Sequence, residues 1–193
     1  MCIRDSPENI IFTLNCTTAL NTVIKGILKQ GDHAVISSLE HNAVVRPLET
    51  LKKNKIEYSV AECVPYDDEQ TIENFRKQFK SNTKLVICTH ASNVFGIKLP
   101  IERIGALCRL NGILFCVDAA QSAGTADINL SDSCIDFLCT AGHKGLYGPM
   151  GTGLLIINSE TTPDSLIQGG TGSDSANLNQ PEICLLYTSD AAD

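Results

Sequence analysis

Four side chains that could do chemistry together follow two short apolar runs in the sequence. They are Asp118 and Gln121, after residues 113–117, and His143 and Lys144, after residues 137–139. A short apolar run that ends in polar and glycine residues is typical of a buried strand. Ligands of open α/β sheets bind at the carboxyl ends of the strands. We therefore expect an acid, an amide, an imidazole and an amine to converge on one crevice.

This set of groups matches the needs of pyridoxal phosphate, an aldehyde cofactor. The cofactor requires an amine for a Schiff base and a carboxylate that keeps its ring nitrogen protonated, so that the ring acts as an electron sink. Lys144 is the predicted amine, Asp118 the partner of the ring nitrogen, and Gln121 the donor to the phenolic oxygen. The sequence thus predicts a pyridoxal phosphate site.

Other readings of the same stretch fit less well. Residues 142–148 contain several glycines and a lysine, but a phosphate-binding P-loop ends in Gly-Lys-Ser/Thr, and here Lys144 precedes the later glycines. No Gly-x-Gly-x-x-Gly motif follows the first predicted strand, which disfavours a nicotinamide-binding fold. Zinc would need Cys134, Cys139 and His143, but paired Cys-x-x-Cys units are absent. We expect no metal.

Apolar patterns on both sides of this stretch predict the remaining elements. We expect strands at residues 10–14, 34–38, 56–61, 84–89 and 152–157, and helices from about residue 17, at 42–53, at 72–79 and at 101–110. Alternating strands and helices indicate an α/β fold, a mostly parallel sheet with helices on both faces in three α/β/α layers. Thr17 or Thr18 is the predicted cap of the first helix, whose free N–H groups would form an anion site.

Composition limits the class of protein. A chain of 193 residues, 43% of them hydrophobic, can bury one substantial core. The net charge of −7 and the absence of a Lys or Arg run disfavour nucleic acid as a partner. No apolar stretch approaches the length of a membrane span and no signal peptide is apparent, so we expect a cytoplasmic protein. The nine cysteines are expected to be reduced, because several lie within apolar runs.

The sequence resembles the class V branch of fold type I pyridoxal phosphate enzymes, and within it the cysteine desulfurase and selenocysteine lyase group. The resemblance covers residues 7–183 and rests on short motifs spread along the chain. These motifs are Thr17-Thr18, Glu40-His41-Asn42, His90 to Asn93, Asp118 to Gln121, Gly142-His143-Lys144, Tyr147-Gly148-Pro149 and Gly169-Gly170-Thr171.

The resemblance implies roles for further residues. It places the cofactor phosphate at Thr17 and Thr18, an imidazole that stacks on the ring at His41, and a contact to the phenolic oxygen at Asn93. It also implies a homodimer, in which a Gly-Gly segment with Thr171 reaches the partner's cofactor phosphate. His143 joins Lys144 among the predicted cofactor contacts.

The resemblance also implies a reaction. The enzyme would remove sulfur from L-cysteine, or selenium from L-selenocysteine, to give alanine and an enzyme persulfide, with Lys144 and His41 as catalytic groups and a sulfur-acceptor protein as a possible partner. The alternatives are another class V enzyme, namely an aminotransferase, an epimerase or a kynureninase-like lyase, and an inactive fragment. Two positions depart from the group: Ala141 replaces its usual Ser or Thr, and Gly145 is an extra residue.

The two ends of the chain differ from the rest. Residues 1–6 and 184–193 follow no structural period and resemble translated cloning sequence, so we exclude them from the fold. We interpret residues 7–183 as a truncated cofactor-binding large domain without its small C-terminal domain. The family's substrate-binding Arg and nucleophilic Cys would then lie beyond the chain, and no cysteine present is assigned as the nucleophile.

Overall fold

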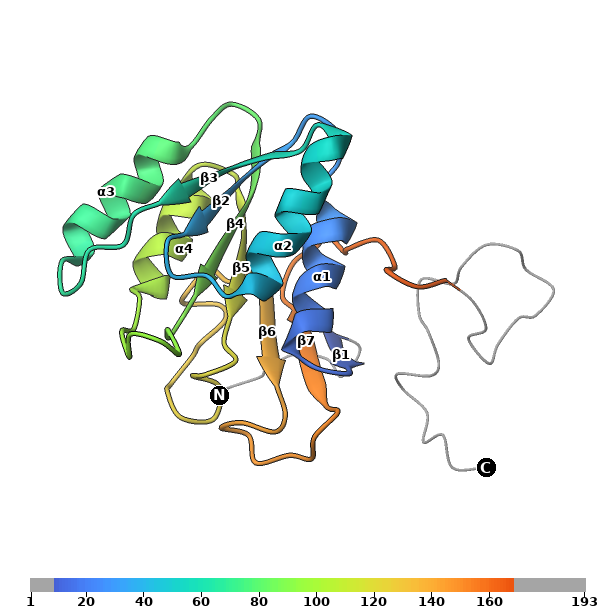
Figure 1. Ribbon diagram of the computed structural model, residues 1–193. Helices are drawn as coiled ribbons and strands as arrows, with labels where there is room; N and C mark the ends of the chain where they lie inside the picture. The colour runs from blue at the N-terminus through green and yellow to red at the C-terminus, as the bar shows by residue number, and fades with distance from the viewer. Residues whose placement is uncertain (1–8, 169–193) are drawn as a thin grey trace.

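The computed structural model describes residues 9–168, which form one seven-stranded sheet covered by helices (Figure 1). The strands are β1 (Ile10–Thr13), β2 (His33–Ser37), β3 (Glu57–Ala61), β4 (Thr83–Thr89), β5 (Leu114–Asp118), β6 (Phe137–Ala141) and β7 (Gly153–Ile157). The helices are α1 (Cys16–Ile27), α2 (Asn42–Leu51), α3 (Asp68–Gln78) and α4 (Ile101–Leu110), with a 3₁₀ turn, η2 (Lys52–Asn54), directly after α2.

The strand order across the sheet is β1-β7-β6-β5-β4-β2-β3. Strands β3, β2, β4, β5 and β6 are parallel to one another, whereas β7 is antiparallel to both β6 and β1. This arrangement confirms the predicted α/β fold with a mostly parallel sheet. Because β6, β5, β4 and β2 are adjacent and parallel, their carboxyl ends lie side by side at one edge.

The sheet is buried on both faces. Helices α1 and α2 cover one face, and α3 and α4 cover the other (Figure 1). Successive residues of β5 alternate between the two layers: Cys116 packs in the α1 layer, and Phe115 and Val117 pack in the α4 layer. Phe75, Phe115 and Phe137 are fully buried. Burial of each such side chain stabilises the fold by about 1.5 to 3 kcal/mol.

Two predicted helix starts are wrong. Neither Thr17 nor Thr18 caps α1; the N-cap is Asn15, whose side chain accepts a hydrogen bond from the Thr18 N–H at 2.9 Å. Asn and Thr are both good N-cap residues, and the turn after β1 decides between them. Helix α3 begins at Asp68 rather than near residue 72, because Asp67 caps it by accepting from the Gln70 N–H at 2.9 Å.

The cysteines of the described part of the chain are all free. Cys116 and Cys139 lie on neighbouring strands with their sulfur atoms 3.9 Å apart. Between residues 9 and 168, no helix has the length and apolar character that crossing a membrane requires.

Candidate active site

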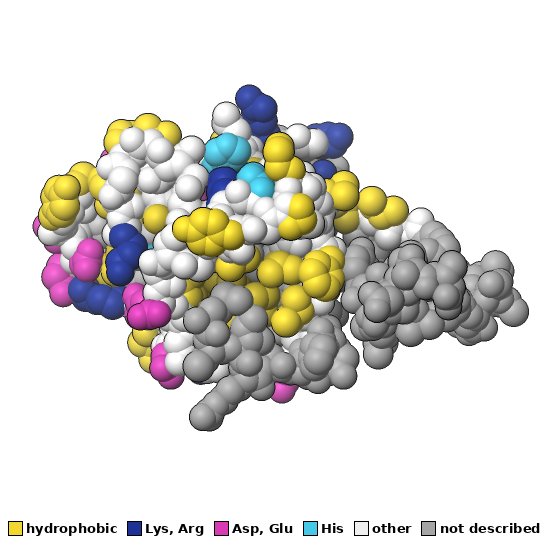
Figure 2. All heavy atoms as spheres, turned by 90° about the horizontal axis from the view of Figure 1, so that it is seen from below, with side chains coloured by type: hydrophobic (Ala, Val, Ile, Leu, Met, Phe, Trp, Pro, Cys, Tyr) yellow, Lys and Arg dark blue, Asp and Glu magenta, His cyan; other side chains and the backbone are white. Residues whose placement is uncertain are grey.

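Four strand ends meet at one edge of the sheet and bring the predicted functional groups together. Asp118 ends β5, Lys144 follows β6, His41 follows β2 and Asn93 follows β4. All four line one cavity of about 90 Å³, together with the N-terminal residues of α1. Figure 2 views the molecule from this side and shows histidine and basic side chains close together among apolar ones.

Asp118 is the buried acid of this cavity. The residue is only 6% exposed, and its Oδ1 accepts hydrogen bonds from the Ala120 N–H at 2.9 Å and from the Cys16 thiol at 3.3 Å. Its second oxygen, Oδ2, has no hydrogen-bond partner among residues 9–168, and the side chain lines the cavity. A carboxylate oxygen that accepts no hydrogen bond from the described residues and belongs to a side chain lining a cavity is available to a cationic or donor ligand.

Lys144 lies in a tight loop directly after β6. Within this loop the Tyr147 N–H donates to the Lys144 carbonyl at 2.9 Å, and the Gly148 N–H donates to the Gly142 carbonyl at 2.7 Å. The Gly142 N–H donates in turn to the Thr152 carbonyl at 2.8 Å, at the start of β7. These bonds hold the backbone of Lys144 at the cavity, while its side chain is exposed and lines the wall.

The loop of Lys144 packs directly on the turn that follows Asp118. A Cβ atom at Gly145 would lie 2.4 Å from the carbonyl oxygen of Ala123, and one at Gly124 would lie 2.2 Å from the carbonyl oxygen of Gly145. Only glycine permits two backbones to approach this closely. The extra residue of the sequence, Gly145, therefore joins the loop that carries the amine to the turn that follows the acid.

His41 caps helix α2 at the cavity wall. Its Nδ1 accepts a hydrogen bond from the Ala43 N–H at 3.1 Å. A neutral imidazole has one donor and one acceptor nitrogen, so this bond places the proton on Nε2. The ring is exposed, and Nε2 is available as a donor to a ligand.

Glu40 is a site residue that sequence analysis did not assign. Its Oε1 accepts hydrogen bonds from the Thr89 N–H at 2.6 Å and from the Ser37 hydroxyl, so it joins the end of β2 to the end of β4. Burial raises the pKa of the Glu40 carboxyl to about 8, against the lowering effect of the Ser37 hydrogen bond and with a further rise from the Asp118 charge. The only signal in the sequence was its position directly before His41.

Cys16 is the second residue that was missed. It is the first residue of α1, is 8% exposed and lines the cavity beside Asp118. Sequence analysis treated the cysteines as small apolar residues, and no local pattern distinguished this one. The contact with Asp118 joins residues that are 102 positions apart.

The remaining predicted residues fall in three groups. The side chains of three of them line the cavity: Thr17, Asn93 and Gln121. Thr18 is not among the lining residues, and its hydroxyl donates to Asn15 Oδ1 at 3.2 Å. His143 is exposed in the loop beside Lys144 but does not line the cavity. Thr171 lies outside the described residues.

Ala141 has no hydroxyl, and the hydroxyl of the neighbouring Thr140 does not replace it because it points to the other face of the sheet. Ala141 packs in the α1 layer of the core, whereas the fully buried Thr140 hydroxyl donates to the Ala119 carbonyl at 3.4 Å. Successive residues of a strand point to opposite faces of the sheet. The hydroxyl of Thr140 is therefore directed away from the start of α1.

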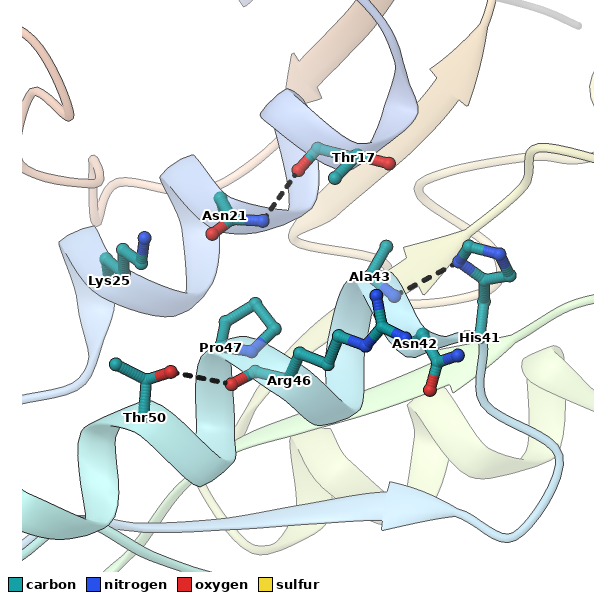
Figure 3. A pocket seen from close by; sticks show the side chains of 9 residues that line it. All are labelled: Thr17, Asn21, Lys25, His41, Asn42, Ala43, Arg46, Pro47 and Thr50. Atoms are coloured by element: carbon teal, nitrogen blue, oxygen red, sulfur yellow. Dashed lines mark hydrogen bonds between the residues drawn. The ribbon is translucent and has the colours of Figure 1, made fainter.

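A wider groove of about 360 Å³ adjoins the cavity between α1 and α2 (Figure 3). Its wall is lined by Thr17, Asn21, Lys25, His41, Asn42, Ala43, Arg46, Pro47 and Thr50. Figure 3 shows the His41 ring bonded to the Ala43 N–H at the start of α2. Thr17, His41 and Ala43 belong to both walls, so the groove, which also carries Lys25 and Arg46, is continuous with the cavity.

The arrangement as a whole suits carbonyl chemistry with acid–base catalysis. It offers a primary amine that can condense with an aldehyde, a fixed carboxylate oxygen that can hold a cation, and an imidazole that can carry a proton. Within residues 9–168, no group of three or more His, Cys, Asp or Glu side chains is placed to bind a metal ion.

Comparisons with known proteins find relatives of this chain. A curated probable cysteine desulfurase from Pyrococcus abyssi is 36% identical over 175 residues, which are 86% of this chain and 43% of that protein. The cysteine desulfurase IscS of Clostridium botulinum is 36% identical over 171 residues, 84% of this chain and 42% of that protein. The chain thus spans less than half the length of these relatives.

Solved structures also match this chain over most of its length. The apo cysteine desulfurase of Thermococcus onnurineus NA1 matches with a TM-score of 0.78 and 35% identity, over 91% of this chain and 45% of that one. A structure of SspA in complex with cysteine matches with a TM-score of 0.75 and 31% identity, over 86% of this chain and 49% of that one. The model of the aminotransferase class-V family matches residues 3–183. The chain therefore belongs to the aminotransferase class-V family.

Proposed function

We propose that the chain is the cofactor-binding large domain of a cytoplasmic, pyridoxal phosphate-dependent cysteine desulfurase. The enzyme would remove sulfur from L-cysteine, or selenium from L-selenocysteine, and release alanine. One observation carries the proposal: the Lys144 side chain and the unpartnered Oδ2 of the buried Asp118 line the same cavity. The relatives named cysteine desulfurases support the choice of sulfur chemistry within the family.

The residues of the cavity fit pyridoxal phosphate. Asp118 Oδ2 accepts no hydrogen bond from the described residues and is free to pair with a protonated ring nitrogen, and Lys144 is an amine that lines the same cavity. Thr17 stands at the first turn of α1, where N–H groups and the helix dipole favour a phosphate. When bound, the cofactor supplies an electron sink for the carbanion that forms at the substrate's α-carbon.

The side chains of this chain would share the proton transfers. Lys144 would hold the cofactor through its side-chain amine, and the same amine, once free, would remove the α-proton of the substrate. We assign proton movement also to His41, whose Nδ1 is held by Ala43 and whose Nε2 is available to the cavity. Gln121 and Asn93 would donate to the phenolic oxygen. Thr18, His143 and Thr171 stay predictions for cofactor binding.

The proposed enzyme would act as a homodimer and pass its sulfur to an acceptor protein. Six large apolar side chains, each between 61% and 91% exposed, lie in segments near the carboxyl edge of the sheet, and they support the dimer: Phe12, Leu14, Val94, Phe95, Tyr147 and Met150. Exposed apolar surface on one side of a protein marks an interaction surface. Light scattering should give twice the chain mass for the unaltered protein, and the mass of one chain after Phe95→Ser.

The cofactor assignment is tested with the purified chain. Pyridoxal phosphate should give an imine absorbance, and borohydride reduction followed by peptide mapping should place the adduct on Lys144. Lys144→Ala should abolish the adduct, whereas Lys98→Ala, which removes another exposed loop lysine, should leave it unchanged. An adduct on a different lysine of the unaltered chain would contradict the assignment.

The reaction is tested on a protein in which this chain is continued to the length of its relatives. L-Cysteine should yield alanine together with sulfide in the presence of a thiol. Keto-acid formation or racemisation without release of sulfur would instead indicate another class V enzyme. Asp118→Asn should slow α-proton exchange by about a hundredfold or more, because the ring nitrogen loses its ionic partner.

A further inference from the structure

We infer that Cys16 is a positioning residue for Asp118: its thiol occupies Oδ1 of the carboxylate, so that Oδ2 is the oxygen presented to the cavity. The inference rests on the proposed function, because it explains how the carboxylate would be held ready for the cofactor's ring nitrogen. It gives a role to a cysteine that is not assigned as a nucleophile.

The contact is buried and selective for one oxygen. Cys16 opens α1 and Asp118 ends β5, and the two residues are 8% and 6% exposed. The Cys16 sulfur lies 3.3 Å from Asp118 Oδ1, and the Ala120 nitrogen lies 2.9 Å from the same atom. Both donors therefore reach Oδ1, and no described residue donates to Oδ2. Rotation of the carboxylate by half a turn would exchange the two oxygens, but it would break both hydrogen bonds on the way.

The sulfur acts as a donor because it keeps its proton. Burial raises the pKa of the Cys16 thiol well above its usual range, and the charge of Asp118 raises it further, whereas Lys144 opposes the rise more weakly. A thiolate in this place would face a carboxylate at hydrogen-bond distance, which like-charge repulsion forbids. The protonated thiol instead donates a hydrogen bond to Asp118 Oδ1.

The two donors to Asp118 differ in how well they fix the position of the carboxylate in the fold. The Ala120 N–H comes from the chain just after Asp118 and moves with it, whereas Cys16 belongs to a helix that is distant in sequence. The thiol thus ties the acid to the start of α1, where Thr17 also lines the cavity. One contact holds the ring-nitrogen partner at a set distance from the proposed phosphate site.

The first test measures cofactor affinity in the purified chain. Cys16→Ala should weaken binding of pyridoxal phosphate about three- to tenfold, the size of one hydrogen bond to a charged group with a weak donor. Cys16→Ser keeps a donor and should stay within about twofold of the unaltered chain. Cys63→Ala removes a buried thiol that lies outside the cavity and should have no effect. If Cys16→Ala does not fold, Cys16→Val replaces it. Equal affinities for the alanine and unaltered chains would overturn the inference.

The second test needs no cofactor. A double-mutant cycle of Cys16→Ala and Asp118→Ala, read as the equilibrium constant of unfolding in urea, should give a coupling of about three- to tenfold between the two sites. Strictly independent effects would overturn the inference. Absence of a Lys144 adduct in the unaltered chain, with the coupling intact, would instead refute the proposed function and leave the contact established.

Discussion

Substitution of Glu40 by glutamine tests how the protonation of this carboxyl affects the stability of the fold beside the site. Glu40 is partly buried, stands directly before His41 of the cavity wall, and joins β2 to β4 through the Ser37 hydroxyl and the Thr89 N–H. Glutamine has the same shape, and its carbonyl oxygen can accept both of these bonds, but it cannot ionise. The substitution therefore removes the titration and leaves the packing in place.

The magnitude follows from the pKa of the Glu40 carboxyl. Burial raises this pKa from 4.5 to about 8, so the folded chain favours the protonated form. At 1.36 kcal/mol per pKa unit, the difference of about 3.5 corresponds to about 5 kcal/mol at most. Between pH 4.5 and 8 the folded chain binds more protons at this site than the unfolded chain, so the stability that the protonated group provides below pH 4.5 falls as the pH rises.

The assay is urea unfolding of the unaltered chain and of Glu40→Gln at several pH values from 4.5 to 8.5. We expect the stability of Glu40→Gln relative to the unaltered chain to increase by about 3 to 5 kcal/mol across this range. Glu62→Gln, which alters an exposed carboxyl just after β3, is the control and should give a nearly constant difference. Parallel pH profiles for Glu40→Gln and the unaltered chain would refute the reasoning.

Two further substitutions test how the site is held. Gly145→Ala should lower the free energy of unfolding by about 1 to 3 kcal/mol and weaken cofactor binding, because its Cβ would lie 2.4 Å from a backbone oxygen. Gly151→Ala, in the same β6–β7 connection but with open space around it, should cost only about 1 kcal/mol for its positive φ; equal losses in thermal unfolding would argue against the loop contact. Asn15→Ala should remove about 1 kcal/mol by loss of the α1 cap, whereas Asn15→Asp should retain it, as measured by urea unfolding. No loss in Asn15→Ala would show that another group caps the helix.

The order of the elements and the positions of the main functional groups could be predicted from local patterns. The apolar residues 113–117 and 137–139 form β5 and β6 as expected, and Asp118 and Lys144 follow them. Such runs bury both faces of a strand whatever their neighbours are, so a short stretch of sequence is enough to predict them. The caps of α1 and α3 were less predictable, because several adjacent residues can serve and only the path of the preceding turn selects one.

The contacts that shape the site depend on the tertiary structure alone. The direction of β7, the packing of Gly145 on Ala123 and the link from Glu40 to β4 join segments that carry no mark of one another in the sequence. The amino-acid sequence by itself determined which acid and which amine stand at the ends of strands. Only the folded sheet decided that a thiol from the start of α1 meets one oxygen of that acid and leaves the other for a ligand, because a contact between residues 16 and 118 exists only once the strands and helices between them have packed.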